Sequence, residues 1–144
     1  MLSDFLSPEE VERIEKAIEE AERVTSGEIR IHITSKQDYD EILLAAVDKF
    51  AELGMDNTQE RNGVLIFICP VRKEFAIIGD EGINRVVGQD FWDATRDVML
   101  AEFKKGRFAD GIIRGVKQAG ESLAKFFPGK KSGVNELPNH ISYD

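Results

Sequence analysis

Oxygen-bearing side chains flank the most apolar stretch of this sequence, residues 64–69. An acid and an asparagine precede that stretch, and two more acids follow the next segment of β-branched and aromatic residues. Calcium and magnesium bind several carboxylate and carbonyl oxygens that converge on one point, commonly from loops. The pattern therefore predicts a divalent-cation site. Its expected ligands are Asp80, Glu81, Asn62 and Glu60, with Glu28 or Asp90 as further ligands.

The same residues also have a simpler, structural interpretation. Asp80 and Glu81 stand just before a short helix that we expect near Ile83, and carboxylates at a helix start cap free amides and favour the helix dipole. Asn62 and the glycine after it would then form only a turn. Helix capping and cation binding therefore both stay open from the residues alone.

Three predicted strands decide which of these residues meet. Residues 64–69 form an unbroken apolar run, as expected of a strand buried on both faces. Residues 28–34 alternate apolar and polar side chains, which predicts a half-buried strand. Residues 73–78 follow a turn at 70–72 and should form an antiparallel hairpin with the central strand. A helix at 42–53 between the first two strands predicts a right-handed parallel βαβ unit.

The strand directions bring the predicted ligands to one edge of this sheet. The starts of the first two strands and the end of the third strand meet there. The opposite edge holds the loop after the first strand and the hairpin turn, with Asp38, Asp40 and Arg72. Ligands of open α/β sheets usually bind beyond the carboxyl ends of parallel strands, so this opposite edge is a second candidate site.

Helical periodicity predicts the layers that cover the sheet. Ser7, Pro8 and Glu10 form a helix start in which serine and glutamate cap each other's backbone amides. The residues of the crossover helix that we expect in the core are Ile42, Leu43, Ala46, Val47, Phe50 and Leu53. The last helix carries glycines that should let it lie close on the sheet, namely Gly111, Gly115 and Gly120. The predicted fold is α/β, a three-layer α/β/α sandwich with a small mixed sheet.

One domain accounts for residues 4–128, a size at which a single core buries about two thirds of the surface of the unfolded chain. The polar remainder, residues 129–144, is predicted to be a C-terminal tail that is loose or docks as extended chain. The residues expected to anchor it are Leu137, Ile141 and Tyr143.

Composition excludes several classes of function. The formal net charge is −8, whereas binding to phosphate backbones requires a basic face, so we expect no nucleic-acid partner. Divalent cations or basic proteins suit this charge better. No apolar run approaches the ~18 residues of a spanning helix, which predicts no direct membrane insertion. The first residues lack the basic start and apolar core of a signal peptide, and we expect a cytoplasmic protein.

The absence of several sequence motifs excludes further kinds of catalytic and metal site. The single cysteine, Cys69, excludes a structural zinc site of the usual kind and is interpreted as a core residue. The sequence has no phosphate-binding GxxxxGK[ST] loop, no GxSxG elbow and no CxxxxxR thiolate loop. Chemistry based on oxygen ligands therefore remains.

The order and spacing of five segments resemble a stand-alone bacterial TPM domain over residues 4 to about 128. These segments are SGEIRIHI, ERNGVLIFI, FAIIGDEGIN, FWDATRDVM and FKKGRFADGI. The resemblance implies an α/β/α sandwich with a small mixed sheet, in agreement with the periodicity. Members of this family are variously described as divalent-cation binders, often of calcium, as weak acid phosphatases, and as membrane-protein accessory modules.

The resemblance can be followed onto single residues. The family's asparagine or aspartate with a glycine before the central strand corresponds to Asn62 and Gly63. Its glycine-rich turn after the third strand corresponds to residues 79–82. The usual aromatic residue between the two glycines is replaced here by Asp80 and Glu81, which moves the acid into the turn itself.

The resemblance thus implies a module that binds calcium or magnesium. A first alternative is a weak metal-dependent phosphomonoesterase, in which a bound cation polarises the phosphate and Arg61 holds the phosphoryl oxygens. A second alternative is a metal-independent interaction module. It would contact a membrane-protein partner through the basic late helices, which include Lys104 and Lys105.

Overall fold

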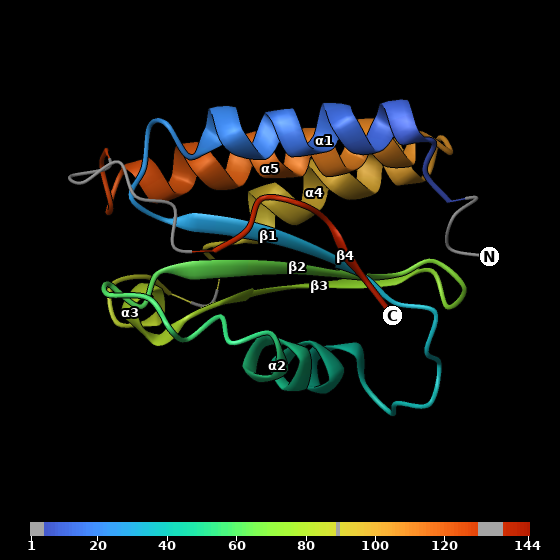
Figure 1. Cartoon of the computed structure of the whole chain (residues 1–144), viewed down its shortest axis with the longest axis horizontal. Helices are drawn as coiled ribbons and strands as arrows, with labels where there is room; N and C mark the ends of the chain where they lie inside the picture. The colour runs from blue at the N-terminus through green and yellow to red at the C-terminus, as the bar shows by residue number, and fades with distance from the viewer. Residues whose placement is uncertain (1–4, 89, 130–136) are drawn as a thin grey trace.

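A mixed β-sheet lies between two layers of helix in the computed structural model, which describes residues 5–88, 90–129 and 137–144 (Figure 1). The strands are β1 (Glu28–Ile33), β2 (Gly63–Cys69), β3 (Glu74–Gly79) and β4 (Ser142–Tyr143). The helices are α1 (Pro8–Ala21), α2 (Ile42–Glu52), α3 (Glu81–Asn84), α4 (Asp93–Phe103) and α5 (Phe108–Ala124). Helices α1, α4 and α5 cover one face of the sheet and α2 covers the other. The predicted α/β sandwich is confirmed.

The described strands are ordered β3-β2-β1-β4 across the sheet. β1 pairs with β2 in parallel, in a register that runs from Glu28 opposite Gly63 to Ile33 opposite Ile68. β2 pairs with β3 in antiparallel fashion. The predicted βαβ unit and hairpin are therefore both present, and the starts of β1 and β2 lie beside the end of β3.

Burial of β2 on both faces holds the layers together. Its alternate residues Val64, Ile66 and Ile68 join the core beneath α1, α4 and α5, while Leu65 and Phe67 join a smaller core beneath α2. Burying a large aliphatic side chain contributes about 1.5–3 kcal/mol relative to leaving it in water. The central strand is thus the part of the fold that both cores share.

Helix α1 begins as its sequence predicts. The Glu10 amide donates to the Ser7 hydroxyl at 3.1 Å, and the Ser7 amide donates to the Glu10 carboxylate at 2.8 Å. This reciprocal capping satisfies two of the amides that a helix start leaves without partners. The buried stripe of the helix comprises Ile14, Ala17, Ile18 and Ala21.

The prediction for the outward face of α2 is wrong. The apolar pattern predicts Leu43 and Val47 in the core, but they are 53% and 48% exposed, and the neighbouring Leu44 is 58% exposed. Because α2 is the only long helix that residues 5–88, 90–129 and 137–144 place on its side of the sheet, only one stripe of it touches the strands. Its remaining apolar residues face solvent. Helix α2 is therefore apolar on parts of both its buried and its exposed sides.

Strand β1 is also more buried than its alternating pattern predicts, because all six of its residues are buried. The described end of the C-terminal segment accounts for part of this burial. β4 pairs in parallel with β1, and the Leu137 amide donates to the buried Glu28 carboxylate at 2.6 Å. Leu137 and Ile141 are buried, whereas Tyr143 is 45% exposed. The tail thus docks as extended chain over residues 137–144.

The glycines of α5 serve helix packing rather than packing on the sheet, which corrects their predicted role. A Cβ atom at Gly111 would lie 2.5 Å from the Phe103 ring, and one at Gly115 would lie 2.5 Å from the Met99 sulfur. A Cβ atom at Gly120 would lie 2.9 Å from the side chain of Ala21. The missing side chains allow α5 to approach α4 and α1 closely.

We predict that Gly111→Ala lowers the free energy of unfolding by about 1–2 kcal/mol. The added methyl group meets the Phe103 ring and the Met99 carbonyl, and such overpacking costs more than the better helix propensity of alanine returns. Urea denaturation followed by circular dichroism measures the change. Lys117→Ala on the exposed side of the same helix is the control and should change stability little. Equal stability of both variants would contradict this account of the α4–α5 contact.

Candidate functional site

The edge at which β3 ends is organised by one charged contact. Arg61 holds both carboxylate oxygens of Asp80, with Nε at 2.9 Å from one oxygen and a terminal nitrogen at 3.1 Å from the other. The Asp80 side chain is buried, whereas Arg61 is partly exposed. The Asp80 carboxylate raises the pKa of the Arg61 guanidinium further above its ordinary value through this hydrogen bond. Asp80 is therefore already matched by a fixed cation.

Asp80 also caps helix α3, as its structural interpretation predicts. Its carboxylate accepts a hydrogen bond from the Glu81 amide at 2.7 Å. The Glu81 carboxylate in turn accepts from Arg85 at 2.8 Å and from Arg61 at 3.3 Å. Both predicted metal ligands are thus engaged by protein donors.

Close backbone approach explains why this edge has its shape. A Cβ atom at Gly82 would lie 2.3 Å from the Glu60 carbonyl, so only glycine lets α3 pack against the loop before β2. Arg61 adopts the left-handed conformation, with φ of 52°, and the Gly82 amide donates to its carbonyl at 2.8 Å. The turn therefore aims the guanidinium of Arg61 at Asp80.

The other predicted ligands at this edge have different surroundings. Asn62 is buried, and its side-chain amide donates to the Ser26 hydroxyl at 3.2 Å. Glu28 is buried and accepts the Leu137 amide. Glu60 and Asp90 are exposed. The structure brings the start of β1, the start of β2 and the end of β3 together as predicted. Metal binding by the six predicted ligands, which are these four residues with Asp80 and Glu81, stays a prediction.

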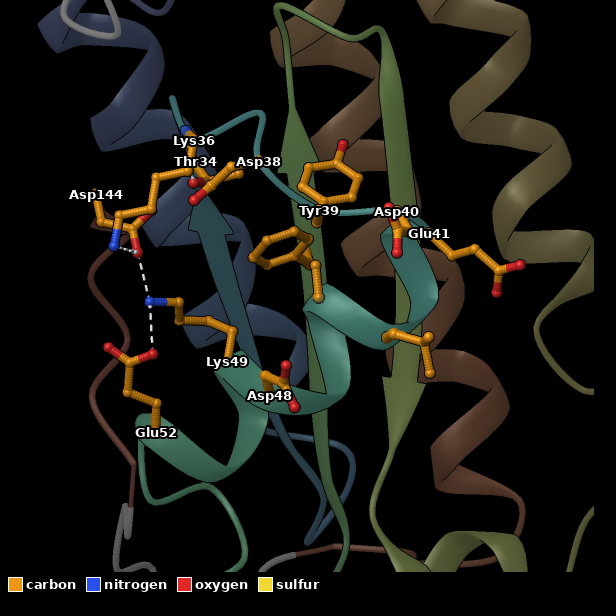
Figure 2. A pocket seen from close by; sticks show the side chains of 13 residues that line it. Thr34, Lys36, Asp38, Tyr39, Asp40, Glu41, Asp48, Lys49, Glu52 and Asp144 are labelled. Atoms are coloured by element: carbon orange, nitrogen blue, oxygen red, sulfur yellow. Dashed lines mark hydrogen bonds and ion pairs between the residues drawn. The ribbon is translucent and has the colours of Figure 1, made fainter.

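A pocket of about 350 Å³ lies at the opposite edge, beside the carboxyl end of β1 (Figure 2). Its walls come from the loop after β1, from α2 and from the C-terminal residue. The carboxylates that line it belong to Asp38, Asp40, Glu41, Asp48, Glu52 and Asp144, and its ammonium groups belong to Lys36 and Lys49. This is the edge that the rule for open α/β sheets identifies as the second candidate site.

Ion pairs occupy one side of the pocket. Lys49 contacts the carboxylates of Asp144 and of Glu52, the latter at 3.0 Å (Figure 2). Burial alone would lower the pKa of Lys49, but the hydrogen bonds that its ammonium donates to Asp144 and Glu52 raise it above its ordinary value. Burial would likewise raise the pKa of Asp144, but hydrogen bonds with Lys49 and Thr34, together with the nearby His32 ring, hold it well below its ordinary range. Lys49 and Asp144 are therefore both charged at neutral pH.

The carboxylates on the other side carry no such partner. Within the described part of the chain, no hydrogen bond or ion pair reaches the side chains of Asp38, Asp40, Glu41 or Asp48. Asp38 and Asp40 come from the loop after β1, and Asp48 comes from α2 (Figure 2). In the part of the chain that the structure describes, no group of three or more acid, histidine or cysteine side chains converges on a position that could hold a metal ion. The unpaired acids thus line the pocket, but their carboxylates do not surround a common position for a metal ion.

Arg72, which belongs to the second predicted site, is bound to the loop after β1, because its guanidinium donates to the carbonyls of Gln37 and Tyr39. Its guanidinium lies 4.0 Å from the centre of the Tyr39 ring and contacts the Glu74 carboxylate at 3.1 Å. The Tyr39 hydroxyl donates to Glu74 at 2.8 Å. Burial, together with hydrogen bonding to Cys69 and Glu74, raises the pKa of Tyr39.

A buried histidine links the pocket to the core of the sheet. His32 is 2% exposed, stacks on Phe67, and its Nδ1 lies 2.7 Å from the Ser142 hydroxyl. Its Nε2 lies 3.1 Å from Asp144, although the two groups are not aligned as a hydrogen bond. Burial lowers the pKa of His32 despite the nearby carboxylate. His32 is therefore neutral at pH 7.

Sequence reasoning missed Asp48, Lys49 and Asp144 as lining residues. Each looks like an ordinary charged position on a helix face or in a polar tail. The one available signal was the rule for parallel strands, which identified the loop after β1 and nothing beyond it. Only the docking of the tail reveals that Asp144 faces α2.

Comparison with known proteins defines the class. A family model for the TPM domain matches residues 2–122, and this chain therefore belongs to the TPM-domain family. The NMR structure of the BA42 protein from the psychrophilic bacterium Bizionia argentinensis is similar to it over 100% of this chain and 99% of that one, with 46% identity and a TM-score of 0.93. No curated protein matches the sequence.

Two more distant structures share the fold. The N-terminal domain of the cg2496 protein from Corynebacterium glutamicum is 15% identical, with a TM-score of 0.66 over 92% of this chain and 80% of that one. The N-terminal domain of a P. gingivalis protein is 18% identical, with a TM-score of 0.70 over 87% of this chain and 80% of that one. Among the residues described in the present structure, no helix is long and apolar enough to cross a membrane.

We predict that Asp80→Ala lowers the free energy of unfolding by about 2 kcal/mol, because it removes both a helix cap and a buried partner of Arg61. Asp80→Asn keeps the cap and should cost less. Urea denaturation of the two variants separates the contributions of the cap and of the ion pair. Asp90→Asn, at an exposed acid, is the control. Unchanged stability in Asp80→Ala would contradict the structural role of this residue.

We also predict that His32 makes the protein less stable in mild acid. Its folded pKa lies below its ordinary value of about 6.5, so the unfolded chain binds more protons as the pH falls below 6.5. The resulting loss of stability approaches ~1.4 kcal/mol per pH unit until the folded pKa is reached. Denaturation between about pH 7.5 and about pH 5.5 should show a smaller pH dependence in His32→Gln than in the wild type.

The matched control for this experiment is His140→Gln, because His140 is the other histidine of the chain and is exposed. It should keep the pH dependence of the wild type. A wild-type slope that survives in His32→Gln would contradict the prediction and assign the pH dependence to other groups.

Proposed function

We propose that this TPM-domain protein is a divalent-cation binding module that takes up calcium or magnesium in the acid-lined pocket beside the carboxyl end of β1. The observation that carries the proposal is a set of carboxylates without partners among the described residues, from Asp38, Asp40, Glu41 and Asp48. The loop that supplies the first three can also turn backbone carbonyls toward an ion, as calcium loops do.

The arrangement supports weak binding. Six carboxylates line the pocket against two ammonium groups, and Lys49 is already neutralised by Asp144 and Glu52. The remaining acids leave an excess of negative charge toward solvent. Because they do not converge, water would complete the coordination shell, as magnesium commonly retains several waters. We expect dissociation constants of about 10⁻⁴–10⁻³ M, the range of the weaker calcium modules.

The edge around Asp80 supports cation binding less well. Arg61 already supplies a positive charge to both oxygens of Asp80, and Glu81 contacts two arginines. A metal ion there would have to displace these donors. The phosphatase hypothesis meets the same obstacle, because it requires the Arg61 guanidinium to face a phosphoryl group.

The interaction-module alternative needs only a surface. Lys104 and Lys105 are exposed after α4, as that hypothesis requires. Loss of a membrane-protein partner in a pull-down after both lysines are neutralised would support it. This alternative does not require the cation site and is tested separately.

Titration with calcium and with magnesium, followed by amide chemical shifts in NMR spectra, tests the proposal. We expect shifts concentrated at residues 38–41 and around Asp48, and a loss of affinity of about tenfold or more in the double variant Asp38→Asn, Asp40→Asn, because two ligand charges are removed. Sodium chloride at matched ionic strength controls for screening. Glu60→Gln with Asp90→Asn is the matched double control and should bind as the wild type does.

The same titration distinguishes the alternatives. Shifts at Asp80 and Asn62 that disappear in Asp80→Asn would place the ion at the other edge and contradict the pocket. Absence of any calcium- or magnesium-dependent shift at millimolar concentration would contradict cation binding altogether. Hydrolysis of a generic phosphate monoester that requires the cation and is lost in Asp80→Ala would favour the phosphatase alternative.

A further inference from the structure

The outward side of helix α2 carries a strip of apolar side chains. Leu43, Val47 and Ala51 follow one another at a spacing of four residues, and all three are exposed. Residues four apart on a helix lie above one another on the same face. Leu44 lies beside this row, three residues before Val47, and is exposed as well. These four side chains therefore form one continuous apolar strip along the helix.

No described part of the chain covers this strip. The inner side of α2 packs against β2 and β3, and residues 5–88, 90–129 and 137–144 place no further helix or strand on its outer side (Figure 1). The other face of the sheet is covered by α1, α4 and α5. Large apolar side chains that are exposed singly are ordinary, whereas a contiguous group of them marks an interaction site. The strip on α2 is such a group.

Acidic side chains border the strip on one side. Asp48 and Glu52 continue the row of Leu44 at the same spacing of four residues, and both acids are exposed. From residue 40 to residue 56 the chain carries five acids and one cation, Lys49. Lys49 is buried and already contacts two carboxylates. The border of the strip is therefore negatively charged.

This combination of shape and charge favours one kind of occupant. A membrane with anionic lipids and a nucleic acid would both be repelled by the acidic border. A second copy that packs symmetrically through the same face would bring acids against acids. An extended strand would gain no backbone hydrogen bonds, because the backbone of α2 is satisfied within the helix. Another helix fits, since rows of side chains on one helix pack into the grooves of a second.

We propose that the outward face of α2 binds a basic amphipathic helix of a partner protein. The apolar stripe of the partner helix lies along Leu43, Val47 and Leu44, and its Lys or Arg side chains lie along Asp48 and Glu52. Apolar contacts supply the affinity of such helix-binding surfaces, while the opposite charges fix the orientation and speed the association. The interaction requires no cation in the pocket and is therefore independent of the proposed cation binding.

Helix α1 provides a comparison within the same chain. It carries six acids, whereas α2 carries two. However, none of the large hydrophobic side chains of α1 is exposed. A basic peptide that binds through charge alone should therefore prefer α1. A peptide that also needs an apolar strip should prefer α2.

Titration of the full chain with a synthetic peptide tests the proposal. The probe is the amidated peptide LKKLLKKLKKLLKK, whose leucines share one face of a helix. In buffer without divalent cations, amide shifts in NMR spectra should concentrate at residues 43–52. The double variant Leu43→Ser, Val47→Ser should bind the peptide about tenfold or more weakly, because it loses the apolar contacts. Val24→Ser with Val86→Ser, at similarly exposed valines elsewhere, is the matched control and should bind as the wild type does.

Reversal of the charged border supplies a second measurement. Asp48→Lys with Glu52→Lys should weaken binding of the lysine peptide. The same variant should bind the peptide LEELLEELEELLEE more tightly than the wild type does, because the border then attracts glutamates. Asp97→Lys with Glu121→Lys, at exposed acids of α4 and α5, is the control and should leave both affinities as in the wild type.

Three results would overturn the proposal. The first is the absence of binding at millimolar peptide. The second is a set of amide shifts that falls on α1 instead of α2, which would show binding through charge alone. The third is an unchanged affinity in the double serine variant of α2, when circular dichroism shows that this variant is folded.

Discussion

The parallel pairing of β1 with β2 is the constraint on which the rest of this structure depends. Two neighbouring parallel strands must both begin at one end of the sheet and finish at the other end. The connection between them must therefore cross one face of the sheet. Helix α2 makes that crossing. The hairpin to β3 then returns the chain to the first edge. Two separated polar clusters, one at each end of the strands, follow from this geometry.

The two clusters differ in what satisfies their charges. At the edge of Asp80, an arginine held by a strained backbone turn engages the buried carboxylate, and the helix start uses the same group as its cap. These contacts hold β2, β3 and α3 together. At the edge of Asp38 and Asp40, the loop acids stay unpaired among the described residues. Acid side chains that do no structural work are the better candidates for a ligand, because binding displaces no existing contact.

The two borders of the sheet are likewise finished differently. On the β1 side, the C-terminal segment adds the short strand β4, and carboxylates of α1 and β1 accept its amides. On the β3 side, the described chain adds nothing. The single helix α2 covers this face of the sheet, and no further described element packs on the outer side of α2. The exposed aliphatic residues of α2 therefore follow from the thin second layer of this sandwich.

The sequence by itself determined the order and type of the elements before the C-terminal segment, the parallel βαβ unit, the hairpin and the meeting of Asn62, Arg61 and Asp80, because hydrophobic period, capping residues and strand direction are local or topological properties. Strand β4 was not among them. Only the tertiary structure decided which partner each charge receives. Asp80 pairs with Arg61, Asp144 pairs with Lys49, which is distant in the sequence, and Leu43 and Val47 are exposed to solvent. Such outcomes depend on how closely separate layers approach, and the side-chain pattern of one segment contains no record of that distance.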